Sequence, residues 1–453
     1  MLDLGTEAAQ LAQQPTLERV RALKRIIPCQ TIYAILKRGP RRRFCPRLPN
    51  AFMVWFVIAL GLFCCDCYRQ VFRWLQVFRR HGTPGRSTLC EARKRLGVAP
   101  LRLLAEKVIQ LRATAQTPEA FYCGMRLMSI DGFVVDLADR PDLARCFGYP
   151  KGGRGAGAFP QARVVTLCET GTHVMWRSLI KPVRRSEVPM AAALLRWLEE
   201  DMLLLWDRGF LSYANVARVR QRRAQLLARI KKNLIFEPIR RLTDGSYLAK
   251  LYRKASDRAK DRNGIVVRII EYTFDDSNRP GAGVKHRLLT TLLDWRQHPA
   301  TKLIVLYHER WEEELAIDEL KTHQRQRPVL RSETPAGVIQ ELYGLLLGHY
   351  VVRSLMVEAA EQAQVPPRRV SFVNTLKILR CRLPECPKSP RGRQQWYEAL
   401  VAEVAEEVLE PRRDRINPRV IRQKMSRWPK KRPDHRRHPQ PRKKIRRSIV
   451  MLC

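Results

Sequence analysis

Apolar residues recur at helical spacing through the first part of the chain. Those between Leu17 and Ile27 fall on one helical face, and a continuous apolar run follows from Ala51 to Cys65. This run has 15 residues and is closed by Asp66, so it is shorter than the about 20 residues that a membrane-spanning helix needs. We therefore predict a buried helix at 51–65 within an all-α N-terminal domain, residues 1–120.

From about residue 121 the pattern changes to alternating strands and helices. Apolar strands are predicted at Met125–Ile130 and Met202–Trp206, with a hairpin at 163–176 and a helix and strand at 212–230. A strand, helix, strand order implies parallel pairing with right-handed crossovers. The alternation predicts an α/β domain over residues 121–410.

Two further segments differ from this alternation. Residues about 235–300 are rich in turns and β-branched residues, and we predict a β-rich insertion there with strands at 265–270 and 287–293, followed by helices at 302–321 and 338–362. Residues 411–453 hold 17 Lys and Arg against 2 Asp and Glu, with repeated prolines and almost no periodicity. This composition predicts a basic C-terminal tail that is disordered or extended.

The charge balance indicates the class of partner. The chain has 85 Lys and Arg and 43 Asp and Glu, a formal net charge of +42, which predicts binding to a polyanion. Its glycines form neither a P-loop nor a dinucleotide fingerprint, so we expect no nucleotide cofactor. The 12 cysteines show no repeated zinc-like spacing, and the N-terminal residues do not resemble a secretory signal. We expect a cytoplasmic protein that does not bind membranes.

Two basic segments of the N-terminal region are candidate DNA contacts. One is a loop around Gly39, and the other is a short helix that Thr88 and Glu91 would cap and Gly97 would end. The alternative for the second segment is an ordinary solvated surface helix. The basic residues of the two segments are Arg41, Arg42, Arg43, Arg93, Lys94 and Arg95.

Two aspartates follow apolar strands directly. Asp131 and Asp207 each stand where a predicted strand ends, at the sheet edge where α/β proteins bind ligands. Two ionised carboxylates brought together repel each other, and a divalent cation is the usual reason to keep both charged. The alternatives are helix-capping or turn roles, and Asp136 and Asp139 compete with Asp131.

The stretch from 307 to 321 carries polar residues at helical spacing. At 100° per residue, Tyr307, Arg310, Glu314 and Lys321 fall within an arc of about 60° on one helix. This face would present an acid between two cations and a phenol. The alternative is a solvent-exposed face with an ion pair between Arg310 and Glu314.

These motifs together resemble the signature of the DDE transposases of the insertion-sequence-4 family. The motifs are Ile130-Asp131-Gly132, the segment Trp206 to Phe210, and a Y-(2)-R-(3)-E-(6)-K pattern that Tyr307, Arg310, Glu314 and Lys321 match at every position. Further similar stretches are Phe147-Gly148, residues 158–161, 289–293 and 418–426, and the N-terminal residues 20–80. The resemblance covers most of the chain.

The resemblance implies a ribonuclease-H-like catalytic core with a β-rich insertion, preceded by the all-α domain. Asp131, Asp207 and Glu314 would be catalytic and bind two divalent metal ions, magnesium with manganese as a substitute. Tyr307, Arg310 and Lys321 would hold DNA phosphates. Relatives often cut through a DNA hairpin that needs a base-stacking aromatic residue, for which Trp311 and Trp295 are candidates.

The function that the resemblance implies is a DNA transposase. It would bind the terminal inverted repeats of its element and catalyse cut-and-paste transposition by two-metal hydrolysis and strand transfer. Its partners would be double-stranded DNA, both repeat ends and target, and a second copy in a dimer on DNA, at the bacterial nucleoid. A non-catalytic DNA-binding descendant and a structure-selective nuclease are the alternatives, and the intact acids favour the enzyme.

Overall fold

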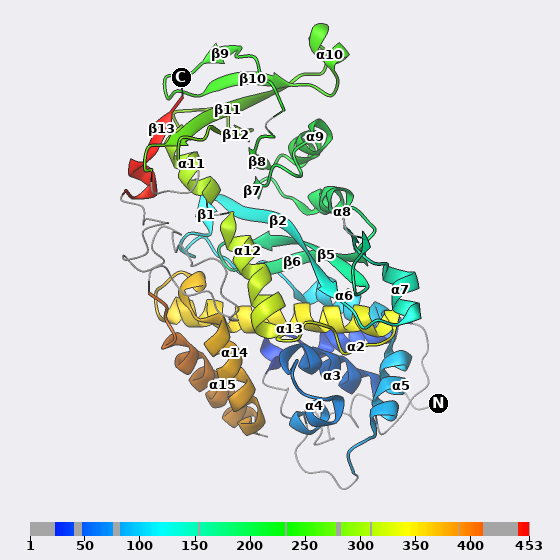
Figure 1. Ribbon diagram of the computed structural model, residues 1–453. Helices are drawn as coiled ribbons and strands as arrows, with labels where there is room; N and C mark the ends of the chain where they lie inside the picture. The colour runs from blue at the N-terminus through cyan, green and yellow to red at the C-terminus, as the bar shows by residue number, and fades with distance from the viewer. Residues whose placement is uncertain are drawn as a thin grey trace. The chain divides into compact units, whose positions relative to one another are not determined.

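The computed structural model describes residues 23–39, 48–75, 82–152, 155–231, 233–277, 282–308, 310–387, 389–410 and 443–452. The chain forms two compact units (Figure 1). The first takes its described residues from 1–124, 130–194 and 312–409, and the second from 125–129, 195–311 and 410–453. Strand β2 (Met125–Asp136) and helix α12 (Trp311–Asp318) each begin in the second unit and continue in the first.

The described residues before 120 are helical and contain no strand, as their apolar spacing predicts. Their helices are α2 (Cys29–Arg38), α3 (Asn50–Leu62), α4 (Tyr68–Trp74), α5 (Arg86–Leu96) and α6 (Ala99–Val108). Every residue of α3 after Asn50 is buried, which confirms the buried helix predicted from the apolar run. Of the helices that the structure describes, none has the length and apolar character to cross a membrane.

Helix α3 packs closely against α13 (Pro335–Gln362) in the first unit. A Cβ atom at Gly61 would lie 2.1 Å from the carbonyl oxygen of Gly344, and one at Gly344 would lie 2.4 Å from that of Val57. Because these neighbours are backbone atoms, a larger residue at either position would force the helices apart. The two glycines therefore set the distance between the helices.

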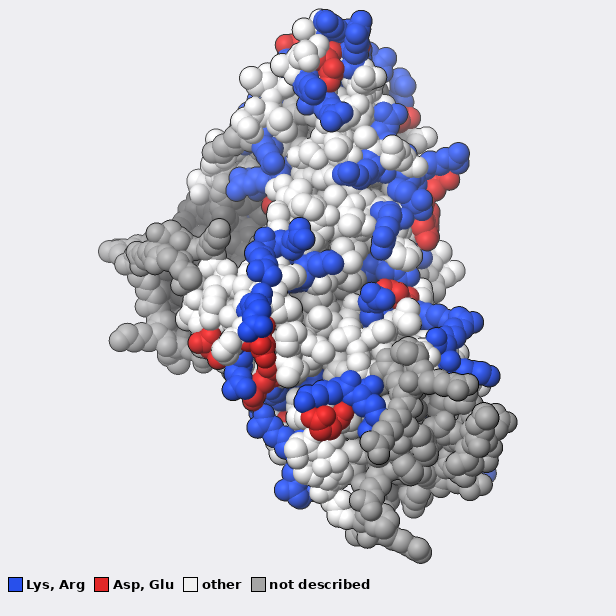
Figure 2. Space-filling model, turned by 90° about the vertical axis from the view of Figure 1, so that its right-hand side faces the viewer, with Lys and Arg blue, Asp and Glu red and all other residues white. Residues whose placement is uncertain are grey.

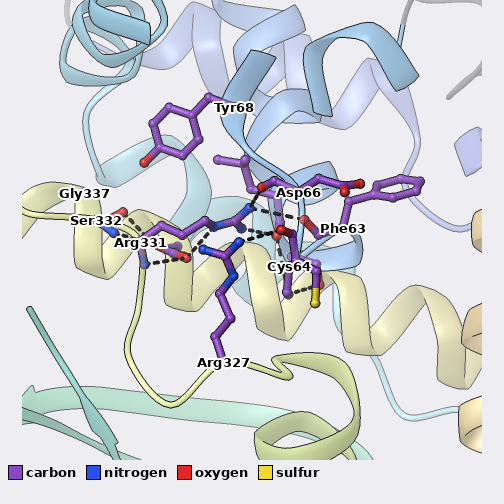
Figure 3. A network of polar contacts seen from close by, with 12 residues as sticks. Phe63, Cys64, Asp66, Tyr68, Arg327, Arg331, Ser332 and Gly337 are labelled. Atoms are coloured by element: carbon purple, nitrogen blue, oxygen red, sulfur yellow. Dashed lines mark hydrogen bonds and ion pairs between the residues drawn. The ribbon is translucent and has the colours of Figure 1, made fainter. Parts of the chain in front are cut away.

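The carbonyls at the C-terminal end of α3 and in the turn after it are satisfied by side chains from elsewhere in the first unit (Figure 3). Arg331 donates to the carbonyls of Leu60, Phe63 and Asp66, the last at 2.8 Å, and its Nε lies 3.1 Å from Oε1 of Glu341. Gln324 Nε2 donates to the carbonyl of Gly61 at 2.9 Å. Because the last helical carbonyls have no partner within their own helix, these donors make burial of this helix end possible.

The strands of the first unit form an antiparallel hairpin beside β2. β5 (Gln161–Glu169) pairs with β6 (Val174–Pro182) from Ala162 opposite Pro182 to Glu169 opposite Val174, which confirms the predicted hairpin. β5 also neighbours β2. The remaining elements of this part are α7 (Pro141–Phe147), β3 (Lys151–Gly152), β4 (Gly155–Ala156) and α8 (Glu187–Leu194).

The second unit contains the predicted parallel strands. The start of β2 pairs in parallel with β7 (Met202–Trp206), and β7 pairs in parallel with β8 (Gln225–Arg229). Helix α9 (Tyr213–Gln221) connects the last two, and Ser212 Oγ caps it by accepting from the amide of Asn215 at 3.3 Å. The strand–helix–strand prediction is confirmed here. The 3-10 helix η3 (Leu195–Trp197) precedes β7 in this unit, whereas β1 (Phe121–Tyr122), which pairs with β2, belongs to the first unit.

The predicted β-rich insertion is an antiparallel extension of β8. It consists of β9 (Arg240–Arg241), β10 (Tyr247–Leu251), α10 (Ala255–Ala259), β11 (Ile265–Phe274) and β12 (His286–Thr290), in the sheet order β8-β12-β11-β10-β9. Near the C-terminus, β13 (Ile449–Met451) follows η7 (Ile445–Arg447) and pairs with β11. For residues 443–452 the alternative of a disordered tail is wrong and that of an extended one holds at 449–451, because these three residues pair with the end of β11. A count of charges cannot reveal such pairing. Residues 411–442 lie outside the described residues.

The strand order β6-β5-β2-β7-β8, with an antiparallel hairpin beside three parallel strands, is that of a ribonuclease-H-like core. The protein is thus an α/β protein with a β-rich insertion and a helical N-terminal region. The elements that follow the insertion are α11 (Ala300–His308), α12, the π-helix η4 (Glu319–Gln324), α13, η5 (Pro367–Arg369), α14 (Phe372–Arg382), η6 (Leu383–Glu385) and α15 (Pro390–Ala405).

Candidate active site

Asp131 is a half-buried residue of the first unit, on β2. The prediction that its strand ends at Asp131 is wrong, because β2 continues to Asp136 with Phe133 and Val135 buried. The Oδ1 atom of Asp131 accepts from the amide of Gly132 at 2.8 Å. A Cβ at Gly132 would lie 1.8 Å from Oε1 of Glu187, so a side chain there would displace that carboxyl from the neighbourhood of Asp131.

The two competing aspartates have structural partners. Asp136 Oδ1 accepts from Nε2 of Gln161 at 2.7 Å, and Asp139 Oδ1 accepts from the hydroxyl of Tyr149 at 2.7 Å. These contacts tie β2 and the following loop to their neighbours. Neither Asp136 nor Asp139 lines the pocket that contains Asp131 and Glu314, so Asp131 is the better candidate for chemistry among the three.

A pocket of about 570 Å³ in the first unit brings Asp131 and Glu314 together. Two cations, Lys321 and Arg163, line the same pocket, and Arg163 lies 3.6 Å from Glu187. Burial raises the pKa of Glu187, and Arg163 opposes this effect. The complete lining is Asp131, Gly132, Phe133, Val134, Pro150, Gln161, Arg163, Val183, Glu314, Ile317 and Lys321.

Arg163 was not predicted from the sequence. It stands two residues after Gln161 on β5, so both side chains lie on one face of the strand. Gln161 ends one of the stretches that resemble the transposase family. The sequence offered two signals, this stretch and the alternation of side chains along the predicted strand. Neither signal distinguishes Arg163 from the many other arginines of the chain.

The helix that carries Glu314 differs from the one predicted. The chain does not form one helix from 302 to 321: α11 ends at His308, Arg310 lies in a turn, α12 begins at Trp311, and Glu319–Gln324 are π-helical. The common arc computed for the four polar residues therefore does not apply. Glu314 is half-buried in the first turn of α12, where the helix dipole favours a negative charge.

Tyr307 and Arg310 belong to the second unit, together with Asp207. Tyr307 is buried, and its hydroxyl donates to the carbonyl of Trp206 at 3.3 Å. Burial raises the pKa of Tyr307 to about 12, an effect that Arg310 opposes and Asp207 reinforces. The Tyr307 hydroxyl thus fixes the end of β7 directly before Asp207, a role that the sequence pattern did not predict.

Asp207 follows β7 in a turn that several contacts hold. The amide of Phe210 donates to the carbonyl of Asp207 at 3.2 Å, and the ring of Phe210 stacks on Trp206 with 5.5 Å between centroids. Asn215 Nδ2 donates to the carbonyl of Phe210 at 2.9 Å. This turn confirms that Asp207 follows the strand end, as predicted.

The donor chemistry of the pocket fits a hard divalent cation. Mg²⁺ is usually held by one or two carboxylates and keeps waters or substrate oxygens as its other ligands. Asp131 and Glu314 are such a pair. No group of three His, Cys, Asp or Glu side chains within the described residues is placed to hold a metal ion. The pocket thus supplies two of the three predicted acids.

The two tryptophan candidates differ in exposure. Trp311, at the start of α12, is 47% exposed. Trp295 is half-buried, with the guanidinium of Arg296 5.0 Å from its ring centroid. Trp311 is therefore the tryptophan with more ring surface available to a base.

Of the predicted N-terminal DNA contacts that the structure describes, it contradicts Arg93 and leaves Lys94 and Arg95 untested. Arg93 is buried and donates to Gln340 at 3.1 Å and to the carbonyl of Gly337 at 2.9 Å, because it joins α5 to α13. Lys94 is exposed and pairs with Glu91 at 2.6 Å. Arg95 is half-buried and donates to the carbonyl of Leu48.

The predicted boundaries of this helix are partly correct. Thr88 does not cap α5, since the helix begins at Arg86 after Gly85, but Gly97 ends it with a positive φ of 66°. Arg41, Arg42 and Arg43 lie outside the described residues. The helix therefore supports the core of the first unit more than it presents a basic surface.

Comparison with known proteins agrees with these motifs. The family model described as "Transposase DDE domain" matches residues 122–350, and the one described as "Insertion element 4 transposase N-terminal" matches residues 17–106. The Escherichia coli K12 protein "Transposase InsG for insertion sequence element IS4" is 29% identical over 395 residues, which cover 84% of this chain and 87% of that protein.

Two further similarities are weaker. The Escherichia coli K12 "Putative transposase InsZ" is 28% identical over 178 residues, 38% of this chain and 56% of that protein. A cryo-EM structure of a piggyBac transposase synaptic complex with hairpin DNA covers 85% of each chain at 12% identity, with a TM-score of 0.41 that is too low to bear on the fold. Because the DDE-domain model spans just over half of the chain, the chain belongs to the DDE transposases of the insertion-sequence-4 family, enzymes that cleave DNA and transfer its strands.

Proposed function

We propose that this transposase binds the terminal inverted repeats of its own insertion element and moves it by a cut-and-paste reaction, with Asp131, Asp207 and Glu314 as its metal-binding acids. The observation that carries the proposal is that Asp131 and Glu314, far apart in sequence, line one pocket with Lys321 and Arg163. Carboxylates beside cations suit a site that must hold both metal ions and phosphates.

The third acid is proposed from the sequence motif. Asp207 directly follows β7 within the segment Trp206 to Phe210, which resembles the second aspartate motif of the family. We therefore propose Asp207 as the third acid of the site.

The chemistry follows from these groups. When bound, two magnesium ions, or manganese in their place, stabilise the attacking and leaving oxygens of an in-line displacement at phosphorus. Asp131, Asp207 and Glu314 supply the carboxylate ligands. Lys321 and Arg163 neutralise the phosphate that enters the pocket, with arginine suited to bidentate contact and lysine to a point charge.

The remaining sequence predictions fit this scheme with one change. Arg310 and Lys321 hold phosphates of the repeat end, whereas Tyr307 supports Asp207 from within the second unit. Trp311 stacks on an unpaired base if the reaction passes through a hairpin.

Figure 2 shows one face of the molecule, on which Lys and Arg are spread widely and Asp and Glu gather in few places, as suits a DNA surface. We propose that the enzyme acts as a dimer on DNA, in the bacterial cytoplasm at the nucleoid.

The proposal is tested with DNA that carries the repeats flanking the gene. We expect nicking at the repeat boundary with magnesium or manganese, and none with chelator or in Asp207→Asn, while that variant still binds the repeat DNA. Binding without metal-dependent cleavage by the wild-type protein would instead identify a non-catalytic DNA-binding protein. Cleavage of branched DNA without repeats would identify a structure-selective nuclease.

A further inference from the structure

A cluster of buried charged groups lies in the first unit, outside the pocket lining. His173, in the turn between β5 and β6, is fully buried, and its Nε2 lies 3.0 Å from Oε2 of Glu312. Its Nδ1 lies 3.0 Å from Oε1 of Glu319. Glu312 is 2% exposed and Glu319 is 8% exposed. One imidazole ring therefore bridges two carboxylates that are seven residues apart in sequence.

Other elements of the same unit complete this cluster. Arg353 on α13 donates to Glu319 at 2.8 Å, and His349 Nε2 lies 3.3 Å from the same carboxyl. Arg368 on η5 lies 3.7 Å from Glu312. Burying an ionised carboxylate without a partner costs free energy. The partners of Glu312 and Glu319 therefore hold each side chain in one conformation.

Glu312 and Glu319 stand on either side of Glu314 in sequence. At about 100° per residue, Glu312 and Glu314 point to nearly opposite sides of α12. Glu314 and Lys321 line the pocket, whereas Glu312 and Glu319 are buried against His173. Glu319 also begins the π-helical turn that carries Lys321, a local geometry that packing must stabilise.

We propose that His173 is a positioning residue for the catalytic helix: it clamps Glu312 and Glu319 on the buried side and so directs Glu314 and Lys321 into the pocket. This inference rests on the proposed function, because it concerns the same site. His173 touches neither a metal ion nor DNA in this scheme. It acts through the two glutamates, and through them sets the affinity of the pocket for a metal ion.

The test is Mn²⁺ binding to the full-length protein without DNA, measured from the electron paramagnetic resonance signal of free Mn²⁺. We expect His173→Leu to raise the Mn²⁺ dissociation constant by about tenfold, because loss of the clamp would leave Glu314 less well oriented, an effect of the size seen when the groups that orient a metal ligand are removed. His173→Gln, which keeps one amide donor, should show a smaller rise. Binding of repeat DNA in chelator should change by less than about twofold, since the clamp makes no DNA contact.

The matched control is Glu358→Gln, which removes a contact of 3.0 Å with Arg112 and one of 3.0 Å with Tyr397 from α13 in the same unit. It should leave Mn²⁺ affinity unchanged. Wild-type affinity in His173→Leu, or an equal loss in Glu358→Gln, would overturn the inference. If His173→Leu does not fold, His173→Gln carries the same test, and faster hydrogen exchange of residues 311–318 in that variant is the second expected result.

Glu314→Gln separates this inference from the proposed function. If that variant binds Mn²⁺ as the wild type does, the metal site itself is wrongly assigned and both proposals fail. If Glu314→Gln loses affinity while both His173 variants keep it, only the positioning role of His173 is refuted.

Discussion

Ser129 and Leu205 face each other in the parallel ladder between β2 and β7. Asp131 stands two residues after Ser129 on β2, and Asp207 stands two residues after Leu205, in the turn that follows β7. The proposed active site takes the two aspartates from the sequence motif and Glu314 from the pocket that it shares with Asp131. We propose that β2 and α12, which the sequence separates by more than a hundred residues, supply ligands to one metal site.

Lys321 should bind one phosphate of the repeat DNA. Lys321→Ala should weaken binding to this DNA and reduce the slope of log K against log salt by about 1, whereas Lys321→Arg should keep most of the affinity. Binding isotherms at several salt concentrations measure both the affinity and the salt slope of each variant. Lys107→Ala, which removes an exposed lysine of the first unit from α6, is the control and should leave the slope nearly unchanged.

The basic segment 411–442 should increase DNA affinity through its charge. Deleting the whole tail would also remove β13, which pairs with β11, so the cleaner variant replaces the Lys and Arg of 411–442 by Gln. The salt slope should fall by about 0.9 for every phosphate that the segment neutralises in the wild type, because the variant releases fewer counterions from the DNA. An unchanged slope would show that this segment does not bind phosphates.

The Arg331–Glu341 pair should be a major stabilising contact of the first unit. Arg331→Met removes the ion-pair partner of the buried Glu341 and one of the donors at the end of α3, so we expect a loss of about 3–5 kcal/mol in the free energy of unfolding. Arg86→Met breaks the exposed pair with Glu333 and should cost less than about 1 kcal/mol. Urea unfolding of both variants decides the comparison, and equal losses would contradict the capping role of Arg331.

Stability should fall as the pH is lowered from 7 to 5. Burial lowers the pKa of His349, so below the ordinary histidine pKa of about 6.5 the unfolded chain binds a proton that the folded chain does not. Burial alone would raise the pKa of Glu319, but Arg353 and His173 outweigh it and hold that pKa well below its usual range. Glu319 therefore adds a further loss only below about pH 4.5.

Thermal melting at pH 7.5, 6.5 and 5.5 tests this dependence. The wild-type midpoint should decrease across the series, and His349→Gln, which does not titrate, should show a smaller decrease. A larger decrease in His349→Gln, or a wild-type midpoint that rises towards pH 5.5, would contradict the sign of the effect.

Much of the fold was predictable from the sequence because its signals are local. The apolar run after Ala51 predicts a buried helix, and the apolar strands before Asp207 and Gln225 predict parallel pairing around a helix. The tail strand β13 was missed because its partner, β11, lies more than 170 residues earlier. Edge pairing of this kind leaves no local pattern.

Two of the three predicted acids share a pocket, but the supporting residues were not predicted. Asp131 and Glu314 line that pocket, as the family motif implies, whereas Tyr307 is buried on α11 with its hydroxyl on Trp206. The break after His308 gives the residues that follow a different helical phase. Arg93 was misread as a surface cation because its partners, Gln340 and Gly337, come from a distant helix. Residue type alone could not separate a buried structural arginine from one that binds DNA.

The most direct test of the active-site assignment is cleavage of repeat-end DNA by Glu314→Gln beside the wild type, with Glu333→Gln as the control. We predict that Glu314→Gln binds the DNA with affinity similar to the wild type but cleaves it at least about a thousandfold more slowly in magnesium, because the variant forfeits several kcal/mol of charge stabilisation from the metal site. Glu333→Gln, which changes an exposed carboxylate of the same unit, should cleave normally. Cleavage by Glu314→Gln at the wild-type rate would contradict the assignment of the active site.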